Sequence, residues 1–197
     1  NGTYTYRVVA WDNRSSALGG KVELQDWSGT VTVGGTDQGV DRSTIFEAES
    51  FDDSSVLTPW EVRSDDPSAR GDGYLVVPAS TPANYSGSMA STGYLDYEFT
   101  TLEDGPIYIA IRALIPSSQP NLSDSVYIDI IGDNTPVYEW KSGFSTDGNG
   151  NWRWFQWANG KPATLPAGTY TLRIGYRESG FKLDQVAISA DLDWNLE

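Results

Sequence analysis

The chain has 197 residues and a formal net charge of −14, from 27 acidic and 13 basic residues, and it contains neither cysteine nor histidine. This composition excludes disulfides, thiolate nucleophiles and histidine-based catalysis, and leaves oxygen-ligated cations, above all calcium, as candidate metals. The acidity disfavours nucleic acid and anionic membranes as partners, and no stretch approaches the roughly 18 apolar residues of a membrane span.

Short β-prone segments, separated by turns rich in Gly, Asn, Asp, Ser and Pro, follow one another along the chain. The first, residues 3–11, is rich in β-branched and aromatic residues and is typical of a strand. The other expected strands are 21–24, 29–33, 45–49, 74–77, 95–100, 107–114, 126–131, 137–140, 152–157, 169–176 and 183–189. No long segment has a helical period. We therefore predict an all-β fold, a β-sandwich or jelly roll with a short N-terminal β-strand extension.

Residues 34–43 are rich in glycine and poor in apolar residues, which is typical of a linker. They separate an N-terminal β-strand piece, residues 1–33, from a main module, residues 44–190. Residues 191–197 form an acidic tail that we expect to fray. Because the chain begins within a strand-like pattern and without signal-peptide features, we interpret it as a fragment or mature product of a longer protein.

Four segments of the main module occur in an order and spacing that resemble a known family. They are IFEAES at 45–50, GYLDYEF at 93–99, LPAGTYTLRI at 165–174 and GFKLDQVAI at 180–188. Together they resemble the jelly-roll carbohydrate-binding modules of families six and thirty-five, over residues 44–190. The resemblance implies a non-catalytic, calcium-stabilised module that binds a polysaccharide or oligosaccharide in a cleft lined by aromatic rings.

Glu47 and Glu49 lie two residues apart in an expected strand, so both carboxylates point to one face. Two such charges repel each other unless a cation lies between them. In the resembled family a structural calcium ion bridges the first and last strands. The resemblance implies that Glu47, Glu49 and Asp184 supply its side-chain oxygens. The alternative is a solvated acidic strand edge.

Aromatic residues make up 13% of the chain, with eight tryptophans, and the apolar face of a pyranose stacks well on such rings. The candidate platforms are Trp60, Tyr74, Trp152 and Trp154. Trp152 and Trp154 share one face of their expected strand, and Phe155 and Trp157 share the other. One face is expected to be core and the other exposed, and for each candidate the alternative is core packing.

Lys182 stands where the resembled family often has an asparagine, near the start of the last strand. Asparagine both donates and accepts hydrogen bonds, whereas lysine only donates and carries a charge. The departure therefore predicts one of two outcomes. Either the ligand is acidic, such as a uronic acid or a sulfated sugar, or the cleft has lost its function.

The N-terminal piece suggests an alternative function. Residues 2–12 and 28–33 look like the last two strands of a fibronectin type III domain. Two isolated strands are marginal in water, and a long apolar strand such as 3–11 is able to complete the sheet of a neighbouring chain. The alternative is thus a structural or adhesive subunit of an extracellular assembly or filament, self-associating through this strand.

We predict no enzymatic activity, because no nucleophile elbow, glycine-rich phosphate loop or His-containing triad is present. The resemblance implies a secreted or cell-surface protein. Glycosylation triplets of the Asn-x-Ser/Thr type mildly favour the same location; they begin at Asn1, Asn13, Asn84 and Asn121.

Overall fold

The computed structural model describes residues 2–8, 27–33, 43–118, 123–133, 138–140, 150–157, 163–191 and 196. The chain divides into two units, Asn1–Val40 and Asp41–Glu197, and the secondary-structure elements that are described are all strands. The all-β prediction is therefore confirmed. Within the described ranges, no helix has the length and apolarity to cross a membrane. The predicted strand 21–24 and residues 34–42 of the predicted linker 34–43 lie outside these residues, and Ser43, the last residue of that linker, begins a strand.

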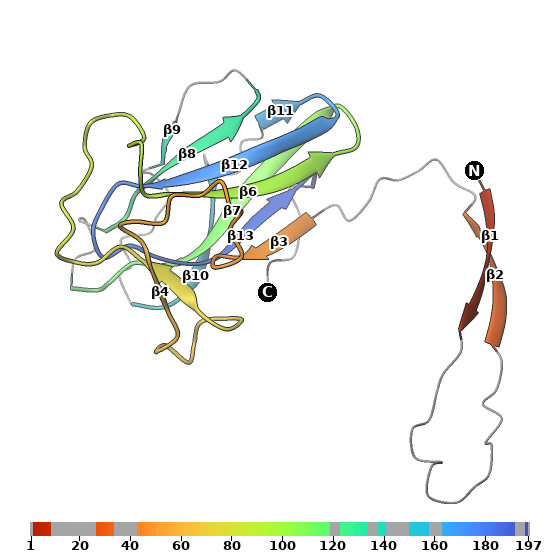
Figure 1. The fold of residues 1–197 in the computed structure, drawn as a ribbon, viewed down its shortest axis with the longest axis horizontal. Helices are drawn as coiled ribbons and strands as arrows, with labels where there is room; N and C mark the ends of the chain where they lie inside the picture. The colour runs from red at the N-terminus through yellow and green to blue at the C-terminus, as the bar shows by residue number, and fades with distance from the viewer. Residues whose placement is uncertain are drawn as a thin grey trace, which may run out of the picture. The chain divides into compact units, whose positions relative to one another are not determined.

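The first unit contains an antiparallel pair of strands, β1 (Gly2–Val8) and β2 (Trp27–Val33), labelled in Figure 1. The pairing runs from Gly2 opposite Val33 to Val8 opposite Trp27. The strand predicted at 3–11 thus has a partner within its own chain. The structure gives no support to its pairing with a second chain.

The larger sheet of the second unit has the strand order β10-β7-β13-β5-β4, with β3 beside β13 and β11 beside β7. Its strands are β3 (Ser43–Glu47), β4 (Glu61–Arg63), β5 (Tyr74–Val76), β7 (Gly105–Leu114), β10 (Arg153–Gln156), β11 (Ala163–Leu165) and β13 (Lys182–Ser189). Neither β4 nor β11 was predicted. β4 (Glu-Val-Arg) has charged residues at both ends and β11 is Ala-Thr-Leu, so neither has the composition, rich in aromatic or β-branched residues, that marked the equally short β5 and β9 (Tyr138–Trp140).

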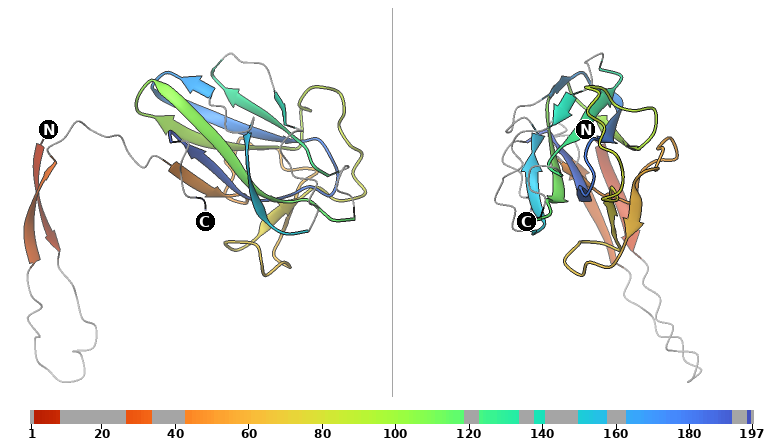
Figure 2. Two further views of the ribbon diagram at one scale, coloured as in Figure 1. Left: turned by 180° about the vertical axis from the view of Figure 1, so that it is seen from behind. Right: turned by 90° about the vertical axis from the view of Figure 1, so that its left-hand side faces the viewer.

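The second sheet of this unit has the order β6-β12-β8-β9. Its strands are β6 (Tyr94–Thr101), β8 (Val126–Ile131), β9 (Tyr138–Trp140) and β12 (Gly168–Tyr176). The two sheets form the two layers visible in Figures 1 and 2, and their facing residues make one core. The predicted β-sandwich is thus confirmed.

Alternate residues of facing strands fill the core. Ile107, Ile109 and Ile111 of β7 and Leu172 and Ile174 of β12 are each at most 3% exposed. This period of two is the one that the sequence showed. Because burial of each such side chain contributes about 1.5–3 kcal/mol, these rows hold the two layers together.

A β-bulge interrupts β13 at Asp184. Leu183 pairs with Ala113 and Gln185 pairs with Arg112, so Asp184 is an extra residue between two regular pairs. The extra residue shifts the alternation by one position, so that Leu183 and Val186 are both core residues with 0% exposure. The bulge also brings the Asp184 carboxylate to Arg112, with which it forms an ion pair.

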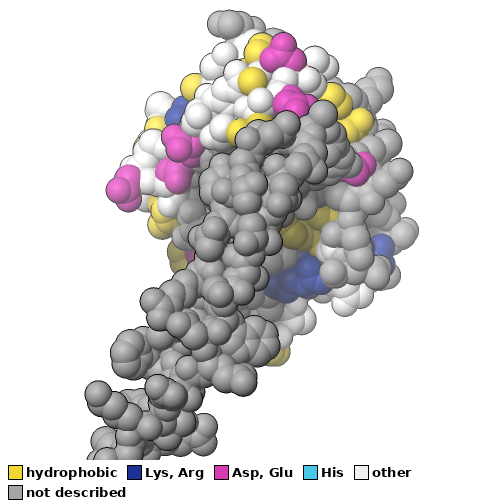
Figure 3. Space-filling view, turned by 90° about the vertical axis from the view of Figure 1, so that its right-hand side faces the viewer, with side chains coloured by type: hydrophobic (Ala, Val, Ile, Leu, Met, Phe, Trp, Pro, Cys, Tyr) yellow, Lys and Arg dark blue, Asp and Glu magenta, His cyan; other side chains and the backbone are white. Residues whose placement is uncertain are grey.

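The larger sheet collects basic side chains on an otherwise acidic protein. One Lys or Arg lies on each of four of its strands, namely Arg63 of β4, Arg112 of β7, Arg153 of β10 and Lys182 of β13. On the face drawn in Figure 3, by contrast, acidic side chains are spread over several places and Lys and Arg show in a few small groups. The same strands carry the carboxylates of Glu47, Glu61 and Asp184, and two of the four cations form ion pairs with them, Arg63 with Glu61 and Arg112 with Asp184.

Gly93 and Gly87 form a matched pair for a test of packing. Their φ angles are +75° and +77°, but a Cβ on Gly93 would lie 2.4 Å from Tyr176 Cδ1, whereas one on Gly87 would have nothing within 4 Å. We expect Gly87→Ala to lower the free energy of unfolding by about 1 kcal/mol, from backbone conformation alone. Gly93→Ala should lower it by about 3 kcal/mol, because overpacking adds to that cost. Urea unfolding compares the two, and equal losses would contradict the tight packing at Gly93.

Candidate functional site

One corner of the larger sheet gathers three of the predicted ligand-binding residues. Tyr74 begins β5, Lys182 begins β13, and Trp152 directly precedes β10. The strands β5, β13, β7 and β10 are consecutive neighbours in the sheet, and Lys182 pairs with both Val76 and Leu114. Residues that are distant in the sequence therefore meet at this corner.

Tyr74 and Trp152 form an edge-to-face aromatic pair, with ring centroids 5.3 Å apart and an interplanar angle of 67°. Lys182 Nζ lies 4.9 Å from the centre of the Tyr74 ring, and Arg112 Cζ lies 5.6 Å from that of Trp152. Each ring thus has a cation within the range of a cation–π interaction. Tyr74 is only 2% exposed, so the prediction that its ring is a platform for a sugar is wrong, and its role at the corner is to support Trp152. Trp152 is half-buried and is the member of the pair with accessible surface.

The loop between β4 and β5, residues 64–73, holds the polar ends of both rings. Asp65 Oδ1 accepts a hydrogen bond of 2.7 Å from the Tyr74 hydroxyl, and Asp66 Oδ2 accepts one of 3.2 Å from Trp152 Nε1. Burial, and then the hydrogen bond to Asp65, raise the pKa of Tyr74 to about 12. The same hydrogen bond lowers the pKa of Asp65. This loop therefore fixes the orientation of the aromatic pair.

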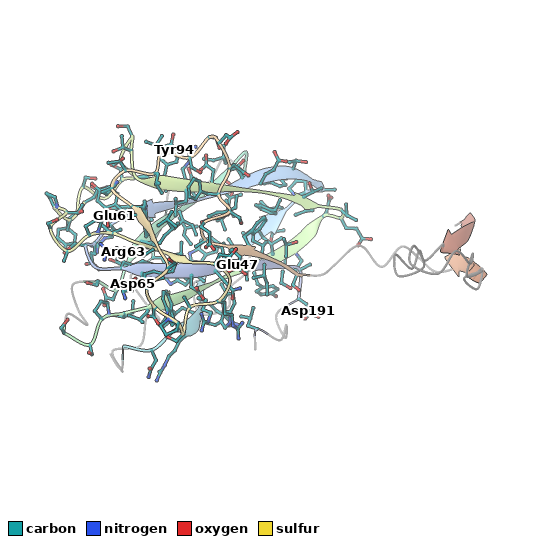
Figure 4. All side chains as sticks on the ribbon, turned by 60° about the horizontal axis from the view of Figure 1, so that its bottom comes forward. Glu47, Glu61, Arg63, Asp65, Tyr94 and Asp191 are labelled. Carbon is teal, nitrogen blue, oxygen red and sulfur yellow. The ribbon has the colours of Figure 1, made fainter. Side chains whose placement is uncertain are left out.

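Figure 4 labels Arg63 of β4 and Asp65 of the following loop, which lie close together, with Glu61 beside them. Arg63 Nη2 donates to Glu61 Oε2 at 2.6 Å, and both side chains of this ion pair are about half exposed. This ion pair is exposed to solvent, in contrast to the buried ion pair between Arg112 and Asp184.

Arg112 connects the loop, the tryptophan and the bulge. Its Nη1 forms the ion pair with Asp184 Oδ2, and its Nη2 donates to the Ser68 carbonyl oxygen at 3.2 Å. The other Asp184 oxygen accepts a hydrogen bond of 3.0 Å from the Arg70 backbone N–H. Burial raises the pKa of Asp184, and the Arg112 guanidinium opposes that rise. Arg112 thus balances a fully buried carboxylate while it lies over Trp152.

Glu47 and Glu49, two of the predicted metal ligands, lie at and just beyond the end of β3, beside β13. Glu47 Oε1 accepts a hydrogen bond of 2.8 Å from Gln185 Nε2. Glu47 Oε2 and Glu49 Oε2 are buried and have no hydrogen-bond partner within the part of the chain that the structure describes. The Gly71 backbone lies against the same carboxyl, since a Cβ there would be 2.6 Å from Glu47 Oε2. Buried carboxylate oxygens without partners are the groups that a bound cation satisfies.

The predicted calcium ligands therefore fit a cation in part. Glu47 and Glu49 each keep one oxygen available, whereas Asp184 already has Arg112 and the Arg70 N–H as partners. In the described ranges, no three His, Cys, Asp or Glu side chains are arranged as a complete metal site. Calcium binding stays a prediction, now with two carboxylates as its firmest candidates.

The prediction of Trp60 as a ligand platform is wrong. Its side chain is 3% exposed, and its Nε1 donates to the Gly93 carbonyl oxygen at 3.0 Å. Its ring packs edge-on against Phe181, at 6.3 Å between centroids, inside the core. The polar residues around Trp60 in the sequence suggested exposure, but the chain turns this side chain inward just before β4.

Trp154 lies on the expected strand but not in the aromatic pair. It is opposite Arg112 in the pairing of β10 with β7, whereas the next residue, Phe155, is 8% exposed and belongs to the core. Trp154 is half-buried, and among the described residues its Nε1 has no hydrogen-bond partner although that atom is buried. Trp154 thus shares the outer face of the sheet with Arg112.

Arg112, Asp65 and Asp66 were missed as site residues. The sequence held a signal for Arg112, because Ile107, Ile109 and Ile111 alternate inward and leave residue 112 on the outer face. It held none for the two aspartates, because their role depends on how the loop folds back over the sheet.

The fold and this corner define a two-layered β-sandwich with a candidate binding site at one sheet corner. No protein-family model and no curated protein matches the sequence. The chain is similar in structure to the GH26-CBM35 β-(1,4)-mannanase of Podospora anserina, with a TM-score of 0.53 at 16% identity over 78% of this chain and 29% of the mannanase. It is also similar to a ruminal GH26 endo-β-1,4-mannanase, with a TM-score of 0.50 at 12% identity over 77% of this chain and 26% of that enzyme.

A further match is the C-terminal CBM6 of LamC from Zobellia galactanivorans, with a TM-score of 0.48 at 16% identity over 75% of this chain and 98% of that module. The name of the Podospora mannanase includes a family 35 module, and family 35 is one of the two families that the sequence resembles. The two mannanase matches show a shared fold, and the chain spans less than a third of either mannanase. The resemblance of residues 1–33 to a fibronectin type III domain stays a prediction.

Arg112→Met and Arg63→Met compare a buried ion pair with an exposed one. Side-chain exposure is 12% for Arg112 and 0% for Asp184, against 45% for Arg63 and 50% for Glu61. We expect Arg112→Met to cost about 3–5 kcal/mol, because it leaves a buried charge unpaired. Arg63→Met should cost less than about 1 kcal/mol. Urea unfolding in the presence of a chelator measures both, and a small loss for Arg112→Met would refute the structural role of its ion pair.

Proposed function

We propose that the second unit is a non-catalytic module of an extracellular protein that binds polysaccharide, with Trp152 as the surface on which a sugar ring stacks. The observation that carries this proposal is the half-buried Trp152 ring, fixed by Tyr74, Arg112 and Asp66. The apolar C–H face of a pyranose stacks on such a ring, and flanking polar groups bind its hydroxyls. The fold shared with the GH26-CBM35 mannanase, whose name includes a family 35 module, supports the proposal.

The fixed orientation of Trp152 favours binding. Three residues contact the indole: the Tyr74 ring packs edge-to-face with it, the Arg112 guanidinium lies over it, and the Asp66 carboxylate accepts its N–H. A side chain ordered in advance loses little conformational entropy when a ligand arrives. Polysaccharide binding through few contacts is therefore more favourable at this ring than at a freely rotating one.

One cation at the corner, Lys182, favours an acidic glycan. Its ammonium lies over the Tyr74 ring and, within the described residues, forms no ion pair, so it is able to pair with a ligand carboxylate or sulfate. Asp65 and Asp66 lie near it and reduce its field, and Arg112 is already bound to Asp184 and Ser68, so the preference depends on Lys182. We propose a uronic-acid or sulfated polysaccharide as the ligand class, with Lys182 as the residue that discriminates.

Trp152→Ala tests the stacking surface. In affinity electrophoresis against neutral and acidic polysaccharides, we expect retardation of the wild type by at least one glycan and loss of at least tenfold in affinity in the variant. Lys182→Asn should keep binding and reduce the preference for acidic over neutral glycans. Leu102→Ala, at an exposed position in the β6–β7 turn, is the control and should bind like the wild type.

Failure of every glycan to retard the folded wild type would refute polysaccharide binding for that panel. Retardation that Trp152→Ala leaves unchanged would instead place the binding surface elsewhere on the module.

We also propose a structural calcium ion at the end of β3, held by Glu47 and Glu49 beside Asp184. Two buried carboxylate oxygens without partners support it. Calcium accepts about six to eight oxygen ligands, so backbone carbonyls and water would complete its shell. Its role would be to neutralise buried negative charge where the first strand of the module meets the last.

Calcium removal tests this site. At a calcium concentration of about 100 times Kd, the ion should stabilise the wild type by about 2.7 kcal/mol, seen by calorimetry as a higher Tm that a chelator reverses. Glu47→Gln and Glu49→Gln should abolish the response and raise the Tm in chelator, because each removes a buried charge without a partner. Glu98→Gln, at an exposed glutamate of β6, should keep the wild-type response. A wild-type Tm that ignores both calcium and chelator would refute the site.

A further inference from the structure

A long loop between β5 and β6, residues 77–93, carries an aromatic side chain at the surface. Tyr85 is 57% exposed. The other large hydrophobic side chains that the described part of the chain exposes are Ile45, Val62, Leu102 and Ile131. Isolated exposed aliphatic residues are ordinary on a protein surface. Tyr85 differs from them because it presents an aromatic ring, and because its surroundings hold that ring in place.

Backbone hydrogen bonds fix the loop on both sides of Tyr85. The Asn84 N–H donates to the Arg177 carbonyl oxygen at 2.7 Å, and the Tyr127 hydroxyl donates to the Asn84 carbonyl oxygen at 2.8 Å. The Gly87 N–H donates to the same Tyr127 hydroxyl at 3.2 Å. The peptide that carries Tyr85 is thus anchored to β8 and to the end of β12, despite its exposure.

A guanidinium supports one side of the ring. Arg177 Cζ lies 4.7 Å from the centre of the Tyr85 ring, and Arg177 Nη1 donates to Ser125 Oγ at 2.6 Å and to Glu178 Oε1 at 2.8 Å. Ser125 and Glu178 are 0% and 4% exposed, and Glu178 Oε2 accepts a hydrogen bond of 2.8 Å from the Asp124 N–H. Buried groups therefore fix the cation, and the cation fixes the ring while more than half of the side chain stays accessible.

Tyr85 lies at the same end of the module as the Trp152 corner. The Val77 N–H donates to the Phe181 carbonyl oxygen at 3.0 Å, and the Gly180 N–H donates to the Val77 carbonyl oxygen at 2.7 Å. These bonds join the loop that leads to Tyr85 with the β12–β13 turn, which Figure 1 shows at one end of the module. That turn begins at Arg177, beneath Tyr85, and leads into Lys182, the first residue of β13. Tyr85 is anchored through Tyr127 to β8 of the second sheet, whereas Trp152 lies beside β10 of the larger sheet. A polysaccharide chain that contacts both rings therefore has to pass over this end of the module and must contain several sugars.

We propose that Tyr85 is a second stacking subsite, which takes a pyranose ring of the same polysaccharide chain that contacts Trp152. The inference rests on the proposed function. A ring that is already ordered stacks on a sugar at little entropic cost. Two subsites on one ligand chain act together only when the ligand is long enough to reach both. The contribution of Tyr85 therefore increases with the length of the ligand.

Calorimetric titration with cello-, manno- and galacturono-oligosaccharides, each as a disaccharide and a hexasaccharide, tests the subsite. For a series that binds, Tyr85→Ala should weaken hexasaccharide binding about threefold to tenfold and leave disaccharide binding unchanged. Tyr85→Phe keeps the ring and should bind like the wild type, and Leu102→Ala is the matched exposed control. An unchanged Tm of Tyr85→Ala shows that the loop change has left the fold intact.

The outcomes separate the two proposals. If Trp152→Ala abolishes binding while Tyr85→Ala leaves the hexasaccharide affinity unchanged, the second subsite is refuted and polysaccharide binding stands. If Tyr85→Ala lowers the affinity for the disaccharide as much as the affinity for the hexasaccharide, Tyr85 belongs to the first subsite and the inference is wrong. If the wild type binds none of the oligosaccharides, the proposed function and the inference that rests on it both fail.

Discussion

The charge of one buried carboxylate governs the arrangement of the candidate site. Asp184 is 0% exposed, and a carboxylate in that position is unstable unless a cation and hydrogen-bond donors compensate it. Arg112 and the Arg70 N–H provide that compensation. Because Arg112 also bonds the Ser68 carbonyl oxygen and lies over Trp152, the balance of one charge fixes the β4–β5 loop and the orientation of the indole. Stability and the orientation of the proposed stacking ring therefore depend on the same guanidinium.

The same charge balance bears on the proposed metal. Glu47 contributes to the raised pKa of Asp184, so the two carboxyls interact, and Glu47 and Glu49 both have buried oxygens without partners. This region thus contains the carboxylates of Glu47, Glu49 and Asp184, and Arg112 forms its ion pair with Asp184. The excess of negative charge is unfavourable in a buried place, and a divalent cation is the direct remedy. Such an ion would lie beside a carboxylate that Arg112 also binds, so the proposed metal site and the proposed sugar site share Asp184 as a neighbour.

The sequence was sufficient for the long strands and insufficient for details that depend on tertiary contacts. Strands such as 107–114 and 169–176 were found because their apolar residues alternate over many positions. The three-residue strand β4 was missed, and with it the loop that carries Asp65 and Asp66. Trp60 was misplaced because its polar neighbours say nothing about the side to which its own ring turns. Tyr74, Trp152 and Lys182 were named through the family resemblance, but their mutual contacts appear only in the folded sheet.

The bulge in β13 has a consequence for which part of the strand is open to change. Deletion of Asp184 would leave Leu183 opposite Ala113 and Gln185 opposite Arg112 as consecutive regular pairs, so that Leu183 and Val186 would both still face the core. The register of β13 therefore does not depend on the extra residue. The deletion would instead remove the carboxylate that Arg112 and the Arg70 N–H bind. The irregularity in this strand thus serves to position a guanidinium on the outer face of the sheet, and the core beneath it would pack equally well without it.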